Sequence, residues 1–154
     1  MPIGTSTLTV TVTESITLNG SQQGGTTTKT IADVNDLFKR IITCPTDEIT
    51  LYTTHESNVA GATFDEDLVK YFRVTNHDGS NYVTLRITDA NSDEFIYKLA
   101  AGESFIIWGH KTSMSAADGA TAGAAGDMAD ILSVEAQAPT AACDLEIIVA
   151  CSAS

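Results

Sequence analysis

The chain has 154 residues, of which 43 % are apolar and 18 % charged, and its formal net charge is −12 with a pI near 4.3. This length suits a single domain with a sizeable hydrophobic core. The acidic balance argues against binding to nucleic acid or to an anionic membrane, because both depend on Lys and Arg. No segment approaches the ~20 apolar residues of a membrane span. Residues 1–7 lack the pattern of a secretory signal, and the three cysteines fit folding in a reducing cytoplasm.

Residues 6–18 predict one long strand, bent near Glu14, because their apolar side chains alternate mainly with threonine. The apolar members are Leu8, Val10, Val12, Ile16 and Leu18. Asn19-Gly20 then predicts a turn. The polar residues 21–30 predict a flexible loop that joins a strand at its end. We expect residues 1–8 to act as an N-terminal arm.

Residues 31–43 are ambiguous. Their apolar side chains fit a helical period, whereas the stretch 37–43 also suits a strand that Pro45 stops. We favour a single helical turn at residues 32–37, followed by that strand. Residues 48–54 predict another strand.

Residues 69–108 predict four short strands joined by tight turns. Val83, Leu85 and Ile87 alternate with polar residues, as on a sheet with one buried face. Residues that tolerate the positive φ of a tight reversal stand at two of the turns. They are Asn76, Asp78, Gly79 and Gly102.

The stretch 113–127 consists mostly of Ala, Gly, Ser and Thr, and predicts an extended loop or arm that becomes ordered against a neighbour. Residues 131–138 and 145–150 predict two final strands. The whole pattern predicts one all-β domain over residues 1–154, an antiparallel β-sandwich of jelly-roll-like type with about 8–10 strands and one long Ala/Gly-rich loop. An immunoglobulin-like topology is the alternative, although its Cys-Trp-Cys spacing is absent.

The two sheets are expected to bury a common set of apolar residues: Val83, Leu85, Ile87, Phe95, Tyr97, Leu99, Phe105, Ile107, Leu145, Ile147 and Val149.

Two acidic stretches are candidate cation sites. Residues 89–94 begin with the D-x-N-x-D pattern of a calcium loop, but Glu94 and Ala100 occupy the positions that require Gly and Glu. We therefore interpret this stretch as a polar hairpin turn. Asp65-Glu66-Asp67 could bind a hard cation at an interface only from a loop, because adjacent strand residues point to opposite faces.

Residues for catalysis are sparse in the sequence. The histidines, His55, His77 and His110, are dispersed and include no adjacent zinc-ligand pair. The chain contains neither a Gly-x-Ser-x-Gly nucleophile turn nor the His-x-His of a cupin metal site. The cysteines, Cys44, Cys143 and Cys151, form no C-x-x-C pair and are interpreted as buried thiols. We assign no catalytic, cofactor-binding or metal-ligating residue, and we expect a protein that is not an enzyme.

Aromatic side chains offer one alternative function. Trp108 and the tyrosines could stack on sugar rings if they gathered on an exposed sheet face. Because aromatic residues make up only 6 % of the chain, we favour a place for them in the core or at a subunit contact. The tyrosines are Tyr52, Tyr71, Tyr82 and Tyr97.

Part of the chain resembles small structural proteins of tailed bacteriophages, including cyanophages and other marine phages. Residues 71–87 read YFRVTNHDGSNYVTLRI, and residues 98–107 read KLAAGESFII. In those proteins a strand ending in (I/V)-x-N-x-D turns into N-(Y/F)-V-x-(L/V), and a later L-x-(A/P)-G-E turn starts the next strand. Residues 34–45, VNDLFKRIITCP, resemble them more loosely. The resemblance covers residues 31–108 and brings no catalytic residues.

The resemblance implies a virion structural protein. We expect a capsid decoration or cement protein on the outer surface of the phage head, contacting the major capsid protein or other virion proteins. We expect a homo-oligomer, with a trimer favoured. We expect its contacts with capsid subunits to lie on residues 1–8, 21–30 and 113–127. The alternative is a tail, neck or fibre-associated sandwich that binds host-surface carbohydrate.

Overall fold

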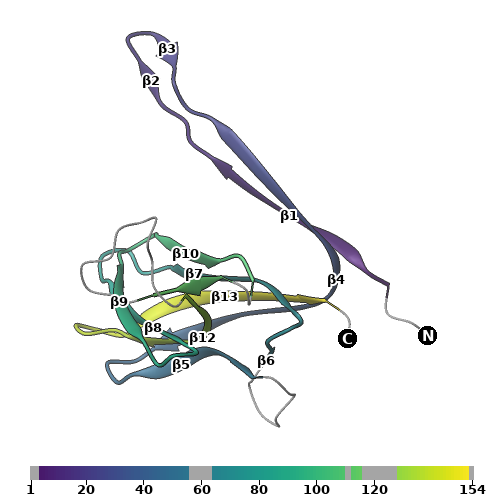
Figure 1. Ribbon diagram of the computed structural model, residues 1–154. Helices are drawn as coiled ribbons and strands as arrows, with labels where there is room; N and C mark the ends of the chain where they lie inside the picture. The colour runs from purple at the N-terminus through teal and green to yellow at the C-terminus, as the bar shows by residue number, and fades with distance from the viewer. Residues whose placement is uncertain (1–3, 56–63, 110–111, 116–127, 153–154) are drawn as a thin grey trace.

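In the computed structural model, which describes residues 4–55, 64–109, 112–115 and 128–152, two sheets face each other and a long hairpin projects from one of them (Figure 1). The first sheet has the order β1 (Ser6–Thr13), β4 (Thr26–Cys44), β13 (Cys143–Ser152), β7 (Val69–Asn76) and β10 (Ser104–Ile107). The second has the order β6 (Phe64–Asp65), β5 (Ile49–His55), β12 (Ala129–Gln137), β8 (Val83–Asp89) and β9 (Glu94–Leu99).

Short pairings complete the strands: β2 (Thr17–Leu18) with β3 (Ser21–Gln22), and β11 (Ser113–Met114) with β12. Among the described residues there is no helix that is long and apolar enough to cross a membrane.

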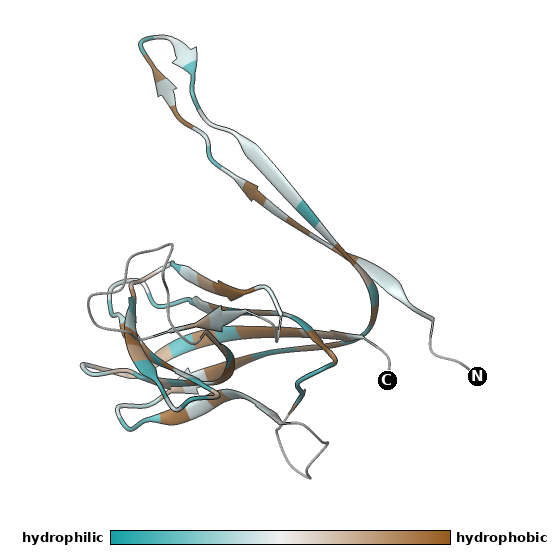
Figure 2. Cartoon of the chain, viewed as in Figure 1, coloured by the Kyte–Doolittle hydropathy of each residue, from teal (hydrophilic) through white to brown (hydrophobic). Residues whose placement is uncertain are grey.

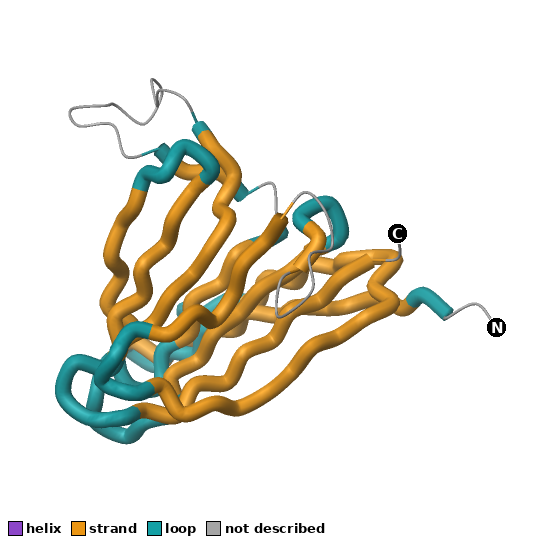
Figure 3. Tube along the Cα trace, turned by 90° about the horizontal axis from the view of Figure 1, so that it is seen from below, coloured by secondary structure: helices purple, strands orange, loops and turns teal. Residues whose placement is uncertain are grey.

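The strand order confirms the predicted fold class. In the sandwich, β4-β13-β7-β10 faces β5-β12-β8-β9, so that chain neighbours repeatedly lie in opposite sheets. This is the pairing of a jelly-roll-like sandwich, in which the chain passes between the sheets several times. The pairs along both sheets are antiparallel except for the short parallel pair β5 and β6. Figure 3 shows both sheets curving along their length.

The core lies between the sheets and follows from alternation along each strand. Val83, Leu85 and Ile87 of β8 and Leu145, Ile147 and Val149 of β13 belong to one core cluster, and all are fully buried. Leu99 and Ile107 are buried as expected, and Phe105 is partly buried against the same cluster. Two predicted core residues, Phe95 and Tyr97, are instead 38 % and 39 % exposed, because β9 is the edge strand of its sheet.

Asn76 joins three segments at one end of the sandwich. Its Nδ2 donates to the carbonyl oxygens of Asn81 (2.9 Å) and Leu99 (3.3 Å), and its Oδ1 accepts from the backbone N–H of Asp78. Asp78 in turn accepts from the N–H groups of Ser80 and Asn81, which lowers the pKa of its carboxyl group. The turn after β7 is thus built by side-chain acceptors, and the expected positive φ at Asn76, Asp78 and Gly79 is wrong. At Gly102 the expectation is confirmed, with φ of 77°.

The expected helical turn at residues 32–37 is also wrong, because these residues belong to the long strand β4. The pairing of β1 with β4 contains a bulge. Between the pairs Leu8–Ile31 and Ser6–Val34, β4 moves by three residues while β1 moves by two. A second bulge, against β13, separates Val34 from Leu37 in the same way. Each bulge inserts one extra residue, so apolar side chains spaced by three remain on one side of a strand. That spacing imitates a helical period.

Candidate functional site

The most distinctive feature of the surface is the hairpin formed by residues 6–34, here called the arm. β4 pairs with β13 over residues 34–44 and with β1 over residues 26–34, so it leaves the sandwich at Val34 and continues outward. Figure 1 shows the arm extending well beyond the two sheets. The strand expected at the end of residues 21–30 is confirmed by β4, which begins at Thr26, whereas the expected loop is shorter because Ser21–Gln22 forms β3.

One face of the arm consists of threonine. The register places Thr9, Thr11 and Thr13 opposite Thr30, Thr28 and Thr26, and directly opposite residues share a face. The hydroxyl groups of Thr11 and Thr28 lie 3.4 Å apart, and those of Thr13 and Thr26 lie 3.3 Å apart. This face is exposed along its length.

The opposite face of the arm is apolar at β1, because Leu8, Val10 and Val12 alternate with threonine along this strand. In Figure 2 the apolar residues appear as brown bands along the arm. Near the sandwich, Leu8, Val10 and Ile31 pack against a small cluster on the outer side of the first sheet. That cluster consists of Val34, Tyr71 and Ala150.

Further along the arm this cover ends. Val12, Ile16 and Leu18 are 43 %, 49 % and 53 % exposed. A two-stranded ribbon with apolar residues in water is at best marginally stable by itself. The distal arm therefore presents apolar side chains that no other described part of the chain covers.

The tip of the arm is nevertheless specifically built. Asn19 and Gly20 adopt positive φ angles of 50° and 77°, which confirms the expected turn. The side-chain oxygen of Gln22 accepts from the N–H groups of Ile16 (3.0 Å) and Gly24 (3.1 Å). Gly24 lies so close to the opposite strand that a Cβ atom there would approach the carbonyl oxygen of Glu14 to 1.9 Å. These constraints indicate a defined shape for the tip.

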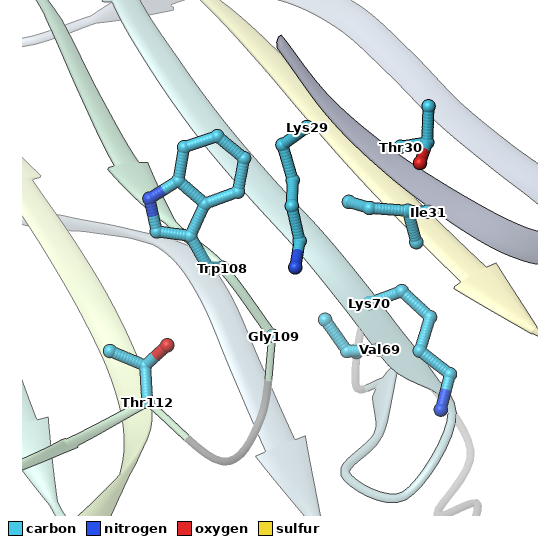
Figure 4. A pocket seen from close by; sticks show the side chains of 8 residues that line it. All are labelled: Lys29, Thr30, Ile31, Val69, Lys70, Trp108, Gly109 and Thr112. Atoms are coloured by element: carbon cyan, nitrogen blue, oxygen red, sulfur yellow. The ribbon is translucent and has the colours of Figure 1, made fainter. Parts of the chain in front are cut away.

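A groove of about 420 Å³ lies between the base of the arm and the first sheet. Trp108 forms one wall, is 44 % exposed, and packs edge-on against Tyr71 with ring centroids 5.6 Å apart. Figure 4 shows the Lys29 side chain lying beside Trp108, whereas Lys70 extends away from it. A neighbouring hollow continues from Trp108 along Val10 and Val12 of the arm. The groove thus joins an exposed aromatic ring to the apolar face of the arm.

Each outer sheet face carries an arginine bound to carboxylates. On the first sheet, Arg73 Nη2 donates to Glu146 Oε1 over 2.5 Å, and the Lys39 ammonium lies 3.4 Å from Glu146 Oε2. These cations, Arg73 above all, lower the pKa of the Glu146 carboxyl group. On the second sheet, Arg86 forms ion pairs with Glu48 at 2.6 Å and Glu94 at 2.5 Å. The clusters join neighbouring strands and act as structural ties.

The candidate cation sites take other roles in the structure. Asp89 is buried, and its Oδ1 accepts from the N–H groups of Asn91 (2.9 Å) and Asp93 (2.8 Å), as expected of a polar hairpin turn. Asp65 Oδ1 similarly accepts from the N–H of Asp67 in a turn after β6. Within the described residues, no three His, Cys, Asp or Glu side chains are grouped so that they could hold a metal ion.

The histidines do not form a site within the described residues. His77 lies at the surface, with its Nε2 4.0 Å from Glu146 Oε2. His110 falls outside the residues that the structure describes, and for His55 only the backbone is described.

The cysteines are free thiols. Cys44 and Cys143 are buried and occupy paired positions of β4 and β13, as expected for thiols that pack as small apolar residues. Burial raises the pKa of both Cys44 and Cys151 to about 11, which disfavours the reactive thiolate.

The three segments predicted to make contacts lie in different parts of the structure. Residues 21–25 belong to the tip of the arm, residues 26–30 run back along it toward the sandwich, and residues 4–8 lie at its base. Ser113–Met114 forms β11 against β12, whereas residues 116–127 lie outside the described part of the chain. The sequence alternation at residues 8–18 was the signal for the arm, but it gave no sign that these residues leave the sandwich.

Comparisons with known proteins identify no relative by sequence: no family model and no curated protein matches the chain. Among solved structures, AlgX of Pseudomonas aeruginosa is similar, with 14 % identity and a TM-score of 0.40. The match covers 75 % of this chain but only 26 % of AlgX, so the chain spans about a quarter of that protein's length. At this level of similarity the match carries no argument about function.

Proposed function

We propose that the chain is a non-enzymatic structural protein of a bacteriophage particle, a capsid decoration or cement protein that stabilises the head. Its arm would insert between subunits of the major capsid protein, and the sandwich would remain on the outer surface as a rigid block. Self-association of the chain belongs to the same proposal.

The observation that carries this proposal is the arm itself. It carries the exposed side chains of Ile16 and Leu18 beyond the sandwich that could have covered them. Burying such side chains against a partner contributes about 25 cal/mol per Å² of apolar surface. Many copies on one particle would add these contacts, because attachment at several points raises the effective affinity.

Charge supports the arm as the contact element. Between residues 6 and 34 the charged side chains are Glu14, Lys29 and Asp33, whereas the chain as a whole carries a net charge of −12. Desolvating charged groups at an interface is costly unless each one finds a partner. The arm is thus the part of this acidic protein that can be buried at low electrostatic cost.

Rebinding to particles that lack this protein tests the proposal. Full-length protein is mixed with such heads, and the bound fraction is measured by co-sedimentation. The variant Ile16→Ser/Leu18→Ser removes the apolar tip and is expected to weaken binding at least about tenfold. The control Ile96→Ser removes a side chain that is 64 % exposed on β9 and is expected to bind normally. Failure of the unchanged protein to bind any head would refute the proposal.

The groove beside Trp108 favours a second candidate function, a tail, neck or fibre-associated module that binds host-surface carbohydrate. An exposed indole ring next to Lys29 and Thr112 could stack on a sugar ring and donate hydrogen bonds to it. On a glycan array, Trp108→Ala should abolish binding, while Phe95→Ala, which alters an exposed aromatic ring elsewhere, should not. Absence of any glycan signal for the unchanged protein would remove this candidate.

A further inference from the structure

β1 is an open sheet edge with little protection against pairing. Over Leu8–Thr13 it pairs in regular register with β4 on one side, and it is the last strand of its sheet on the other. This stretch contains no charged residue, no proline and no bulge. Exposed edges of this kind tend to pair with another strand.

The other edges in the described part of the chain are short, charged or bulged. β10 has four residues and β6 has two. β9 carries the charged residues Glu94 and Lys98. β5 has a bulge at Leu51, where its register with β12 shifts. The open stretches of β4 carry five charged residues: Lys29, Asp33, Asp36, Lys39 and Arg40. Charges and bulges are the usual devices that prevent edge pairing. Their absence from Leu8–Thr13 distinguishes β1 from the other edges.

The sequence of β1 fits a second copy of itself. Residues 7–13 read TLTVTVT, which is symmetric in residue type about Val10. In an antiparallel pair centred there, Val10 lies opposite Val10 of the other copy, and Leu8 lies opposite Val12. Thr9 likewise lies opposite Thr11, repeating the threonine pairs that already join β1 to β4. A contact between identical chains across a two-fold axis must be self-complementary in this way.

We propose that two copies of this chain pair β1 to β1, antiparallel and centred on Val10, to form a four-stranded ribbon β4-β1-β1-β4. The register keeps both apolar faces on one side of the ribbon and both threonine faces on the other, because a shift by one residue would mix them. The ribbon roughly doubles the width of the apolar face. The proposal rests on the proposed function only in taking the arm as the contact element, and it replaces the expected trimer with a two-fold pair.

Disulfide trapping tests the register. In the proposed pair, the Cα atoms of residue 10 in two Val10→Cys chains would lie within the ~4.4–6.8 Å separation that a disulfide requires. Mild oxidation is expected to convert most of this variant to a covalent dimer. The control Thr27→Cys places a thiol on the same face, one strand away from the axis, and is expected to give no dimer above that of the unchanged protein. Equal trapping of both variants, or of neither, would overturn the proposal.

Sedimentation velocity provides a test that does not depend on a change at Val10. Thr9→Lys/Thr11→Lys places lysines opposite lysines across the axis, on a face that is exposed in the single chain. We expect the dimer dissociation constant to rise at least about 100-fold. The control Thr26→Lys/Thr28→Lys adds the same charge to the same face of β4 and should remain a dimer.

A monomer or trimer of the unchanged protein in that experiment would overturn the proposed pair. Head binding by a monomeric protein would leave the virion role standing while refuting this pair. A dimer that does not bind heads would refute the virion role while leaving this pair standing.

Discussion

The arm and the sandwich are built from the same kind of strand, yet they use it differently. In the sandwich, alternating apolar residues such as Leu85 and Leu145 meet a second sheet and are completely buried. In the arm the same alternation continues through Val12, but no second sheet faces it and 43 % of that side chain is exposed. Alternation specifies which side of a strand is apolar, and the covering layer determines whether that side contributes to stability.

This contrast separates two tasks. The sandwich contains the residues that set the free energy of unfolding, and its outer faces carry ion-paired arginines. The arm adds little to that free energy, because the apolar residues of its distal part are exposed. Substitutions in the two regions should therefore have different consequences.

The largest effect is expected for Phe72→Ala in the sandwich. Phe72 is fully buried and packs against Tyr52 in a tilted arrangement with ring centroids 4.7 Å apart. Its truncation should lower the free energy of unfolding by about 3–5 kcal/mol, as measured by denaturant titration. Val12→Ala in the arm should change it by less than about 0.5 kcal/mol. Comparable losses for the two variants would show that the arm shares in the global stability.

Asn76→Ala should cost about 2 kcal/mol, because the buried carbonyl of Leu99 and the part-buried carbonyl of Asn81 lose their donor and the turn after β7 loses an acceptor. Thermal unfolding measures the change. The variant should still bind partners through the arm, which shares no contact with this end of the sandwich in the structure. A loss below about 0.5 kcal/mol would mean that water replaces these hydrogen bonds.

Glu146→Gln should reduce stability by about 1 kcal/mol at neutral pH and remove part of its pH dependence. Arg73 lowers the pKa of Glu146 in the folded state, so this pair stabilises the protein above the unfolded-state pKa of the carboxyl group. That contribution is lost as the pH falls through the folded-state pKa. Between about pH 6 and about pH 3, the unchanged protein should therefore lose more stability than the variant. Parallel curves for both proteins would contradict this assignment.

Gly24→Ala should have the smallest global effect and a large local one. A Cβ atom at Gly24 would collide with the backbone of Glu14, so the tip must rearrange. Gly25→Ala is a matched control, because nothing lies within 4 Å of its Cβ position. Amide hydrogen exchange in residues 14–25 should accelerate for the first variant, while the melting temperature stays unchanged. Equal exchange in the two variants would show that the tip has no fixed shape.

Alternation and turn residues were sufficient to predict the all-β sandwich and most of its core. They failed where position in the sheet decides the outcome: Phe95 and Tyr97 alternate correctly but lie on the edge strand β9. The spacing of Ile31, Val34 and Leu37 suggested a helical turn because two bulges each add a residue to β4.

The arm could not be predicted as an arm. Its strands have the composition of core strands, and only the absence of a facing layer distinguishes them. Its turn at Asn19-Gly20 was evident from the sequence, whereas the role of Gln22 in fixing the tip depends on contacts between residues on the two sides of the turn.

The central claim is that the arm, and not the sandwich, contacts the partner. Hydrogen exchange of the full-length protein, free and bound to phage heads that lack it, tests this most directly. We predict that slowed exchange on binding is concentrated in residues 6–18, with β9 unchanged although its side chains Phe95, Ile96 and Tyr97 are exposed. Slowed exchange concentrated in β9, with the arm unchanged, would contradict the account.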